Sequence, residues 1–289
     1  MSENFTFDYN EAFSRNIGWV TEDEQTVLQS KRIAIAGMGG VGGSHLLTLT
    51  RLGIGKFNIA DFDTFELANF NRQAGASIPT ISQEKSATMK NLAQAINPEL
   101  DIKRFEHGVT VDNLDNFLDG VDLYIDGLDF FVLDIRQKVF ARCDELGIPA
   151  ITAAPLGMGT ALLTFLPGKM SFEQYFRLQG HDPMEQQIRF LVGLSPSFLH
   201  QPYLVDKSRV NFVDQKGPST PMACELCAGA TATEALKILL GRGKVQCAPW
   251  GYQFDAFRNK FKKTWRPGGN ENIIQKIAIY IARKMILDR

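Results

Sequence analysis

A glycine-rich stretch at residues 37–43 (Gly-Met-Gly-Gly-Val-Gly-Gly) could bind a charged ligand. The apolar run 32–36 before it is typical of a buried strand, and the run 44–51 after it is typical of a helix. A strand, a tight glycine turn and a helix N-terminus aim backbone N–H groups and the helix dipole at one point, where a phosphate can bind. Because such loops serve NAD, FAD and ATP alike, this pattern predicts a nucleotide but does not say which one.

Three charged residues after this loop indicate which reaction the bound nucleotide would take part in. Asp61 ends the second predicted strand, 56–61, where the ribose hydroxyls of a bound nucleotide would lie. Arg72 and Lys85 follow it. A nicotinamide enzyme transfers a hydride, and this reaction gives no reason for fixed cations near the nucleotide. An enzyme that attacks the α-phosphate of ATP needs them, because negative charge builds on that phosphorus and on the departing pyrophosphate.

These motifs, in this order and spacing, resemble the ubiquitin-activating superfamily, whose bacterial members adenylate the sulfur-carrier proteins of thiamine and molybdopterin synthesis. The resemblance covers roughly residues 15–155 and then fades, apart from a helix expected at 229–241. It rests on Gly-x-Gly-Gly-x-Gly at 37–42, Asp-x-Asp at 61–63, Asn-x-x-Arg-Gln at 69–73 and Lys85.

The resemblance also implies roles for individual residues. Asp61 would bind the ribose, and Asn69 would bind the phosphates together with the two cations. Asp126-Gly-Leu-Asp129 matches the family's Asp-x-x-Asp, which makes Asp129 the expected magnesium ligand. The family usually has Asn directly after this aspartate, whereas this chain has Phe130. The contact to the base of the nucleotide is therefore expected to differ. Asp126 could equally cap a helix. The residues expected around ATP are Gly37, Gly39, Gly40, Gly42, Asp61, Asn69, Arg72 and Lys85.

Arg15 precedes a predicted helix whose capping box is Thr21-Glu-Asp-Glu24. An exposed arginine in an N-terminal arm would be ordinary. In the resembled family, however, an arginine at this place reaches the triphosphate bound by the partner subunit. We therefore expect a homodimer in which Arg15 takes part in catalysis together with Arg72 and Lys85.

One Cys-x-x-Cys pair, Cys224 and Cys227, allows two interpretations. Relatives that bind zinc use two such pairs, and no histidine lies near this one in the sequence, so a tetrahedral zinc site is not expected. Cys224 lies in the segment before the helix expected at 229–241, roughly where relatives keep the nucleophile that takes an acyl group as a thioester or acyl-persulfide. The alternative is a pair of partly buried structural thiols.

The order of the predicted elements indicates the fold. Strands alternate with helices through residue 154, which predicts right-handed crossovers and a parallel sheet. The expected fold is a Rossmann-like α/β sheet, parallel at first and mixed towards the C-terminus, with helices on both faces. Residues 1–31 would form an N-terminal arm and helix, 32–265 a nucleotide-binding adenylation domain with a variable insert at about 167–223, and 266–289 a linker and an amphipathic helix.

The helix expected at 273–287 has an apolar face and a basic face. Most such helices dock on their own domain or on a dimer partner. The alternative is peripheral contact with a membrane, because Lys276, Arg283 and Lys284 flank a broad apolar stripe.

Composition argues against several classes of protein. The chain has 289 residues and a formal net charge of −1, so a nucleic-acid partner is not expected. The N-terminus lacks the basic and apolar stretches of a signal peptide, and no apolar run is long enough to span a membrane. Four cysteines are too few for a disulfide scaffold, so we expect a cytoplasmic protein.

The sequence therefore predicts an ATP- and Mg²⁺-dependent adenylyltransferase that activates the C-terminal carboxylate of a small ubiquitin-like or sulfur-carrier protein. An alternative in the same superfamily is a dehydratase that cyclises a threonylcarbamoyl group on tRNA, which adenylates a carboxylate without a cysteine. Two functions of different classes stay open. One is an NAD-dependent oxidoreductase that uses the same glycine loop, and the second is a non-catalytic module that keeps the nucleotide pocket.

Overall fold

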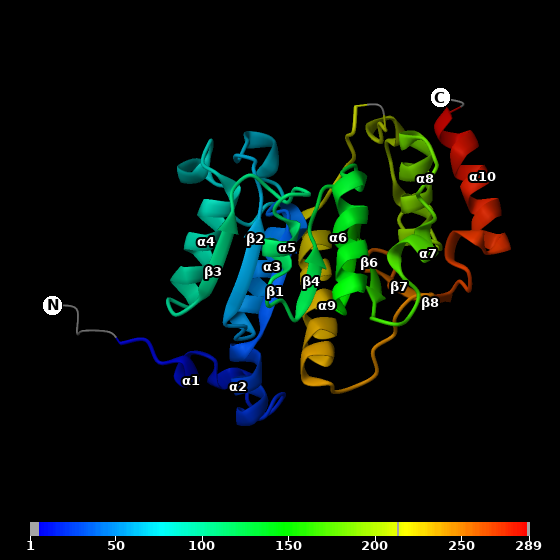
Figure 1. Cartoon of the computed structure of the whole chain (residues 1–289). Helices are drawn as coiled ribbons and strands as arrows, with labels where there is room; N and C mark the ends of the chain where they lie inside the picture. The colour runs from blue at the N-terminus through cyan, green and yellow to red at the C-terminus, as the bar shows by residue number, and fades with distance from the viewer. Residues whose placement is uncertain (1–5, 213, 288–289) are drawn as a thin grey trace.

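A single sheet runs through the part of the chain that the structure describes. The computed structural model describes residues 6–212 and 214–287 (Figure 1). Eight strands in these ranges lie in the order β3-β2-β1-β4-β5-β6-β7-β8; neighbours from β3 to β5 are parallel, and β6, β7 and β8 are antiparallel additions. The predicted fold class is confirmed. The strands are β1 (Arg32–Ala36), β2 (Lys56–Ala60), β3 (Asp101–Phe105), β4 (Leu123–Asp126), β5 (Ala150–Leu156), β6 (Gly159–Phe165), β7 (Trp250–Asp255) and β8 (Lys260–Trp265).

Helices flank the sheet and extend the molecule at one end, where α8 and α10 lie side by side (Figure 1). The α-helices are α1 (Tyr9–Ala12), α2 (Glu22–Ser30), α3 (Gly40–Arg51), α4 (Lys85–Ile96), α5 (Leu114–Leu118), α6 (Leu133–Leu146), α7 (Phe172–Phe176), α8 (Pro183–Leu194), α9 (Pro221–Leu240) and α10 (Ile273–Leu287). Short 3₁₀ helices are η1 (Ser14–Asn16), η2 (Leu67–Asn69), η3 (Ile78–Thr80), η4 (Gln201–Tyr203), η5 (Lys207–Arg209) and η6 (Gly269–Glu271).

The central strand β1 contributes to two apolar cores. Its residues Ile33 and Ile35 pack with side chains of α3, α4 and α9 on one face of the sheet. Ala34 and Ala36 point to the other face, where α5, α6 and α7 supply large aromatic residues. All residues of β1 are buried, as expected of a parallel strand that is covered on both sides.

The strand order reverses between β1 and β4. The chain runs from β1 outward to β2 and β3, and then returns to the other side of β1 with β4. Ligands of such sheets bind at this point, beyond the carboxyl ends of the strands. The turns that follow β1 and β4 are therefore the place to look for a site.

Two helices begin earlier than their sequence patterns predict. α9 begins at Pro221 and not at residue 229, because Pro221 supplies the fixed φ of a first helical position and buried small residues such as Ala223 continue the core face. Cys224 therefore lies in the first turn of this helix, which corrects its predicted place in a preceding segment. α3 begins at Gly40 and not at residue 44, because its glycines let the first turn pack directly on the end of β1.

The expected linker before α10 is folded against the rest of the chain. Asn270 is fully buried and donates hydrogen bonds to the carbonyls of Phe176 (2.7 Å) and Arg189 (2.9 Å). α10 then packs on α8, which is one of the arrangements expected for it. The division into three parts remains a prediction. Within residues 6–212 and 214–287, no helix has the length and apolar character needed to cross a membrane.

Candidate nucleotide site

The glycine loop between β1 and α3 leaves no room for side chains at two positions. Gly37 has a φ of +87°, and a Cβ there would overlap the carbonyl oxygen of Gly127 in the turn after β4. A Cβ on Gly42 would overlap the carbonyl oxygen of Gly37. The N-cap of α3 is Gly39, and no side chain caps this helix end. Its first N–H groups are therefore open to an anion, and the helix dipole favours negative charge there.

Asp61, just after β2, holds the glycine loop in place. Its Oδ2 accepts a hydrogen bond from Met38 N at 2.6 Å, and its Oδ1 accepts one from Asp63 N at 2.8 Å. Burial raises the pKa of Asp61 above its usual value, although these hydrogen bonds and the nearby Lys85 oppose the shift. Lys85 is buried and pairs with Asp63 Oδ2 at 2.9 Å. The Asp-x-Asp motif thus links the loop to the expected phosphate-binding lysine.

Arg72 lies beside the first turn of α3. A Cβ placed on Gly40 would be 3.4 Å from Arg72 Cγ. The guanidinium donates to Ala68 O at 3.1 Å and to Asn71 Oδ1 at 2.9 Å, and these two bonds leave donors free for a ligand. Asn69 is buried, and its Oδ1 accepts from Glu66 N at 3.0 Å. The structure therefore brings Arg72 and the glycine loop together. Asn69 lies three residues before Arg72 in the chain.

Asp126, at the end of β4, belongs to the protein interior. Its Oδ2 accepts hydrogen bonds from Arg136 Nε and from Thr152 Oγ1, each at 2.8 Å. The side chains of Asp126 and Arg136 are both 2% exposed. Asp126 is therefore committed to a buried ion pair, and it does not cap α6, whose N-cap is Val132.

Asp129 is exposed at the same edge of the sheet, two residues beyond the glycine that touches Gly37. Its Oδ1 accepts from Phe131 N at 3.0 Å. Among the described residues, no group of three or more His, Cys, Asp and Glu side chains could hold a metal ion. A magnesium ion at a nucleotide needs only one or two carboxylates besides the phosphates, and a single exposed carboxylate fits that requirement. Phe130 packs on Phe190 and Phe212 of the insert, with ring centroids 5.4 and 6.2 Å away.

Cys224 is nearer to the glycine loop than its sequence position indicates. A Cβ on Gly40 would be 3.0 Å from Cys224 Sγ. The side chain is buried; burial raises the pKa of the Cys224 thiol, and the positive charge of Arg72 opposes that shift. Cys227, one helical turn on, is also buried, donates from Sγ to Thr160 Oγ1 at 3.1 Å, and has a pKa raised by burial.

Arg15 lies at the opposite end of α3 from the loop of its own chain. The neighbouring Asn16 donates from Nδ2 to the carbonyls of Arg51 (3.4 Å) and Leu52 (3.2 Å), where α3 ends. A helix of 12 residues is about 18 Å long. Arg15 itself is exposed. From this position it does not reach the glycine loop of its own chain.

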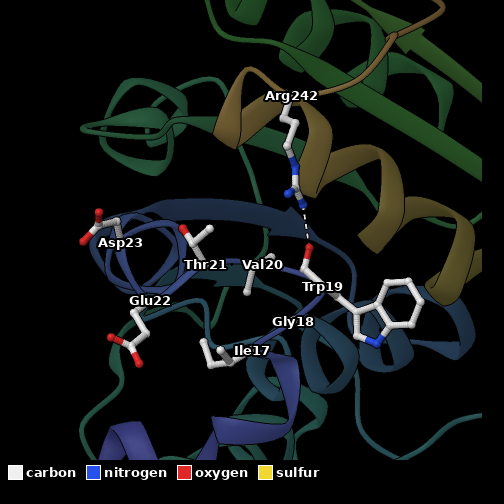
Figure 2. A pocket seen from close by; sticks show the side chains of 8 residues that line it. All are labelled: Ile17, Gly18, Trp19, Val20, Thr21, Glu22, Asp23 and Arg242. Carbon is white, nitrogen blue, oxygen red and sulfur yellow. Dashed lines mark hydrogen bonds between the residues drawn. The ribbon is translucent and has the colours of Figure 1, made fainter.

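A surface groove lies where the chain enters α2 (Figure 2). It has a volume of about 490 Å³ and is lined by residues 17–23 and Arg242. Arg242 Nη2 donates to the carbonyl of Trp19 at 2.8 Å, while the indole of Trp19 is 85% exposed. The groove is formed by the segment before α2 and the residue after the C-cap of α9, so it is separate from the glycine loop.

The model of the ThiF family matches residues 13–272, which is most of the chain. The chain belongs to the ThiF family. The resemblance to the ubiquitin-activating superfamily, drawn from the motifs at 37–85, is thereby confirmed.

Curated relatives of this ThiF-family chain differ in name. It is 41% identical over 99 residues to ubiquitin-like modifier-activating enzyme 5 of Drosophila erecta, covering 32% of this chain and 23% of that protein. It is 30% identical over 148 residues to protein HesA of Leptolyngbya boryana, covering 51% and 53%. It is 32% identical over 107 residues to tRNA threonylcarbamoyladenosine dehydratase of Bacillus subtilis (strain 168), covering 37% and 42%. The matches thus span between about a quarter and half of these relatives.

Solved structures share the fold over almost the whole chain. PaaA aligns with a TM-score of 0.65 at 18% identity, covering 92% of this chain and 77% of PaaA. E. coli MccB with ATP aligns with a TM-score of 0.65 at 18% identity, covering 90% and 73%. These similarities show that the chain shares its overall fold with these proteins.

Two features of the site were not predicted from the sequence. The first is the hydrogen bond from Met38 N to Asp61, although an aspartate whose side chain bonds nearby backbone is a known turn device. The second is the contact of Cys224 with the loop around Gly40. No local pattern could have indicated that contact, because the packing of α9 on α3 joins parts of the chain that are far apart in sequence.

Proposed function

We propose that this ThiF-family protein is an adenylyltransferase that uses ATP to activate a carboxylate, with the C-terminal carboxylate of a small ubiquitin-like or sulfur-carrier protein as the substrate. The observation that carries the proposal is the uncapped N-terminus of α3 with Arg72 beside it. Open N–H groups and a guanidinium at one point suit a phosphorus that gains negative charge.

In this reaction the chain supplies position and positive charge. A terminal carboxyl group titrates at about 3.3 to 3.7, so the attacking oxygen is ionised at neutral pH and needs no general base. That oxygen forms a bond to the α-phosphorus, and the bond from this phosphorus to the bridging oxygen breaks, so that pyrophosphate leaves with the electron pair. The N–H groups of α3, Arg72, Lys85 and Asn69 hold the phosphates in line.

The remaining members of the site complete the proposal. Asp61 binds the ribose while it holds the loop. Asp129 would hold Mg²⁺, which supplies further positive charge at the phosphates when it is bound. Arg15 comes from the partner subunit of a homodimer, because it lies a helix length away from its own loop. Cys224, buried beside Gly40, takes the acyl group only if its thiol is first exposed and deprotonated.

Names of relatives support a small protein or peptide as the substrate. One relative is named a ubiquitin-like modifier-activating enzyme, and MccB has been solved together with MccA. A second candidate function is supported by the match to tRNA threonylcarbamoyladenosine dehydratase, which would activate a carboxylate on tRNA.

The experiment that tests the proposal is magnesium-dependent exchange of labelled pyrophosphate into ATP, with a cell extract divided into small-protein and tRNA fractions. Exchange requires reversible formation of an acyl-adenylate. We expect the small-protein fraction to stimulate it, whereas stimulation by tRNA would establish the second candidate. ATP binding without exchange in either fraction would overturn the proposal.

Replacing Arg72 or Asp129 by alanine should lower the exchange rate about 10²- to 10³-fold, because each change removes charge at the phosphates. Arg142→Ala is the matched control, since Arg142 pairs with Asp115 and Glu145 on the exposed side of α6. A wild-type rate of pyrophosphate exchange in Arg72→Ala would show that Arg72 does not take part in the reaction. Unfolding temperatures of the three variants should match the wild type.

A further inference from the structure

Two contacts from outside α9 hold the residues that precede this helix. Ser219 O accepts a hydrogen bond from Asn71 Nδ2 at 3.0 Å, and Thr220 Oγ1 donates to Gly157 O at 2.6 Å. Thr220 is the N-cap of α9, but its side chain does not cap the helix. Residues 214–218, just before these two, are all exposed. The segment is therefore attached to the rest of the protein at its end, next to the first turn of α9.

The attached end lies against the thiol of Cys224, which is 1% exposed. Burial raises the pKa of the Cys224 thiol, while a hydrogen bond with the Ser219 side chain and the positive charge of Arg72 oppose that shift. Ser219 and Arg72 therefore both act on the same sulfur. A reagent from solvent reaches a sulfur this deeply buried only when the structure around it opens locally.

Asn71 connects Ser219 to Arg72. Its Oδ1 accepts from Arg72 Nη1 at 2.9 Å, while its Nδ2 donates to Ser219 O. The two ends of a carboxamide are fixed relative to each other, so the bond to Arg72 determines which end faces Ser219. Arg72 Nη1 also donates to Ala68 O at 3.1 Å. A phosphate that binds the other donors of this guanidinium, on Nε and Nη2, would hold Arg72 and with it Asn71.

We propose that Asn71 is a positioning residue that keeps Ser219 against Cys224, and that a phosphate bound by Arg72 strengthens this closure. The thiol is thereby kept from reacting while the phosphates of the nucleotide are in place. Asn71 acts only through its two neighbours in this network. The inference rests on the proposed function only in that ATP binds at the glycine loop.

The test is the rate at which iodoacetamide alkylates Cys224 in the full chain, measured by mass spectrometry of the peptide that carries it. Asn71→Ala removes both side-chain bonds, whereas Asn71→Asp keeps an acceptor for Arg72 and loses the donor to Ser219. We expect each variant to raise the rate about 5-fold, because losing one hydrogen bond shifts a local opening equilibrium by about that factor.

Three comparisons separate this effect from a general loosening of the fold. Asn113→Ala is the matched control, because Asn113 Nδ2 also donates to a backbone carbonyl, that of Gly108 at 2.8 Å, in the turn between β3 and α5. Its rate at Cys224 should equal that of the wild type. Cys247 should be alkylated at one rate in all of these proteins. Opening raises the rate at Cys224 at every pH, whereas a changed pKa of the thiol would move the midpoint of the pH profile.

Saturating ATP tests the connection to Arg72. ATP should slow alkylation of Cys224 about 5-fold more in the wild type than in Asn71→Ala, because only the wild type transmits the position of Arg72 to Ser219. Equal slowing would mean that ATP merely shields the thiol, and this result would overturn the proposal. A wild-type rate without ATP in either Asn71 variant would overturn it as well. Failure of the proposed function is distinguishable, because a protein that binds ATP without exchanging pyrophosphate still gives these rates.

Discussion

At the scale of single residues, Cys224 can be used to distinguish adenylation of the substrate from transfer of the acyl group to a thiol. It lies in the first turn of α9, beside Gly40 and Arg72, and it is buried. The thiolate is the nucleophilic form of cysteine. Because burial raises the pKa of Cys224, less of it is thiolate at neutral pH than in an exposed cysteine. Attack on phosphorus by a substrate carboxylate does not involve this thiol at all.

We therefore expect Cys224→Ser to keep pyrophosphate exchange within about three-fold of the wild type, because no positive charge at the phosphates is lost. If Cys224 takes the acyl group, the same variant will lose a thiol-sensitive covalent adduct with the carrier, seen on a non-reducing gel. Alkylation of Cys224 by iodoacetamide should be slow at pH 7 and speed up as the pH rises through the raised pKa. Cys247→Ser serves as the control. Loss of pyrophosphate exchange in a folded Cys224→Ser protein would show that adenylation depends on this side chain.

At the scale of elements, the end of β4 and the start of α6 are joined by the buried pair of Asp126 and Arg136. Arg136 also donates to the carbonyls of Leu128 (2.7 Å) and Asp129 (3.0 Å) in the turn between them. Its guanidinium lies 4.7 Å from the ring centroid of Phe190 in α8. One buried arginine thus fixes the turn that carries Asp129 and connects it to the insert.

Asp126→Asn should lower the free energy of unfolding by about 3 to 5 kcal/mol, because it leaves Arg136 as a buried charge without its partner. Denaturant unfolding followed by circular dichroism measures this change. Asp115→Asn breaks an exposed pair with Arg142 and should leave the denaturation midpoint unchanged. An equally small effect at Asp126 would mean that Arg136 is held by the carbonyls alone.

Local patterns predicted most elements well, because strand and helix periodicity is a property of neighbouring residues. The strands predicted at 32–36 and 56–61 and the helix predicted at 273–287 agree with the structure within one residue. The first eight residues of α9 lie outside the helix predicted at 229–241, although Pro221 is a helix-start signal. Contacts between distant elements, such as Cys224 with the glycine loop, depend on how α9 packs on α3 and were not predictable from either segment.

At the scale of the whole molecule, α10 presents a second apolar face. One face packs through Ile279 and Ala282 on α8. On the other, Ile273, Ile277 and Ile281 are 69%, 54% and 50% exposed. The family match ends at residue 272, just before this helix begins. It carries three cations and no acidic residue, and two of these cations already form ion pairs, Lys276 with Glu271 and Arg283 with Glu185.

An anionic membrane surface would suit that face, and peripheral contact is therefore the arrangement we test. The protein should sediment with vesicles that contain anionic lipid and much less with neutral vesicles, because apolar burial and charge act together. Ile277→Glu with Ile281→Glu should abolish this binding. Leu92→Glu, on the 37% exposed Leu92 of α4, is the matched control. Concentration-dependent dimerisation that the double variant abolishes would instead assign the face to a second copy.

Arg15 gives a sharper test of assembly, because it lies beside the C-terminal end of α3 and thus a helix length from its own glycine loop. Arg15→Ala and Arg72→Ala should each be inactive alone if Arg15 acts in the partner's site. In a mixed dimer, the subunit with Arg15→Ala keeps its own Arg72 and receives Arg15 from its partner, so one site is complete. Random mixing of equal amounts should therefore restore exchange to about a quarter of the wild-type value. Activity measured after mixing and re-equilibration decides the point, with each variant mixed with itself as the control. If Arg15→Ala is fully active alone, the arginine has no role in either site; if both variants are inactive and mixing restores nothing, Arg15 does not act across a dimer.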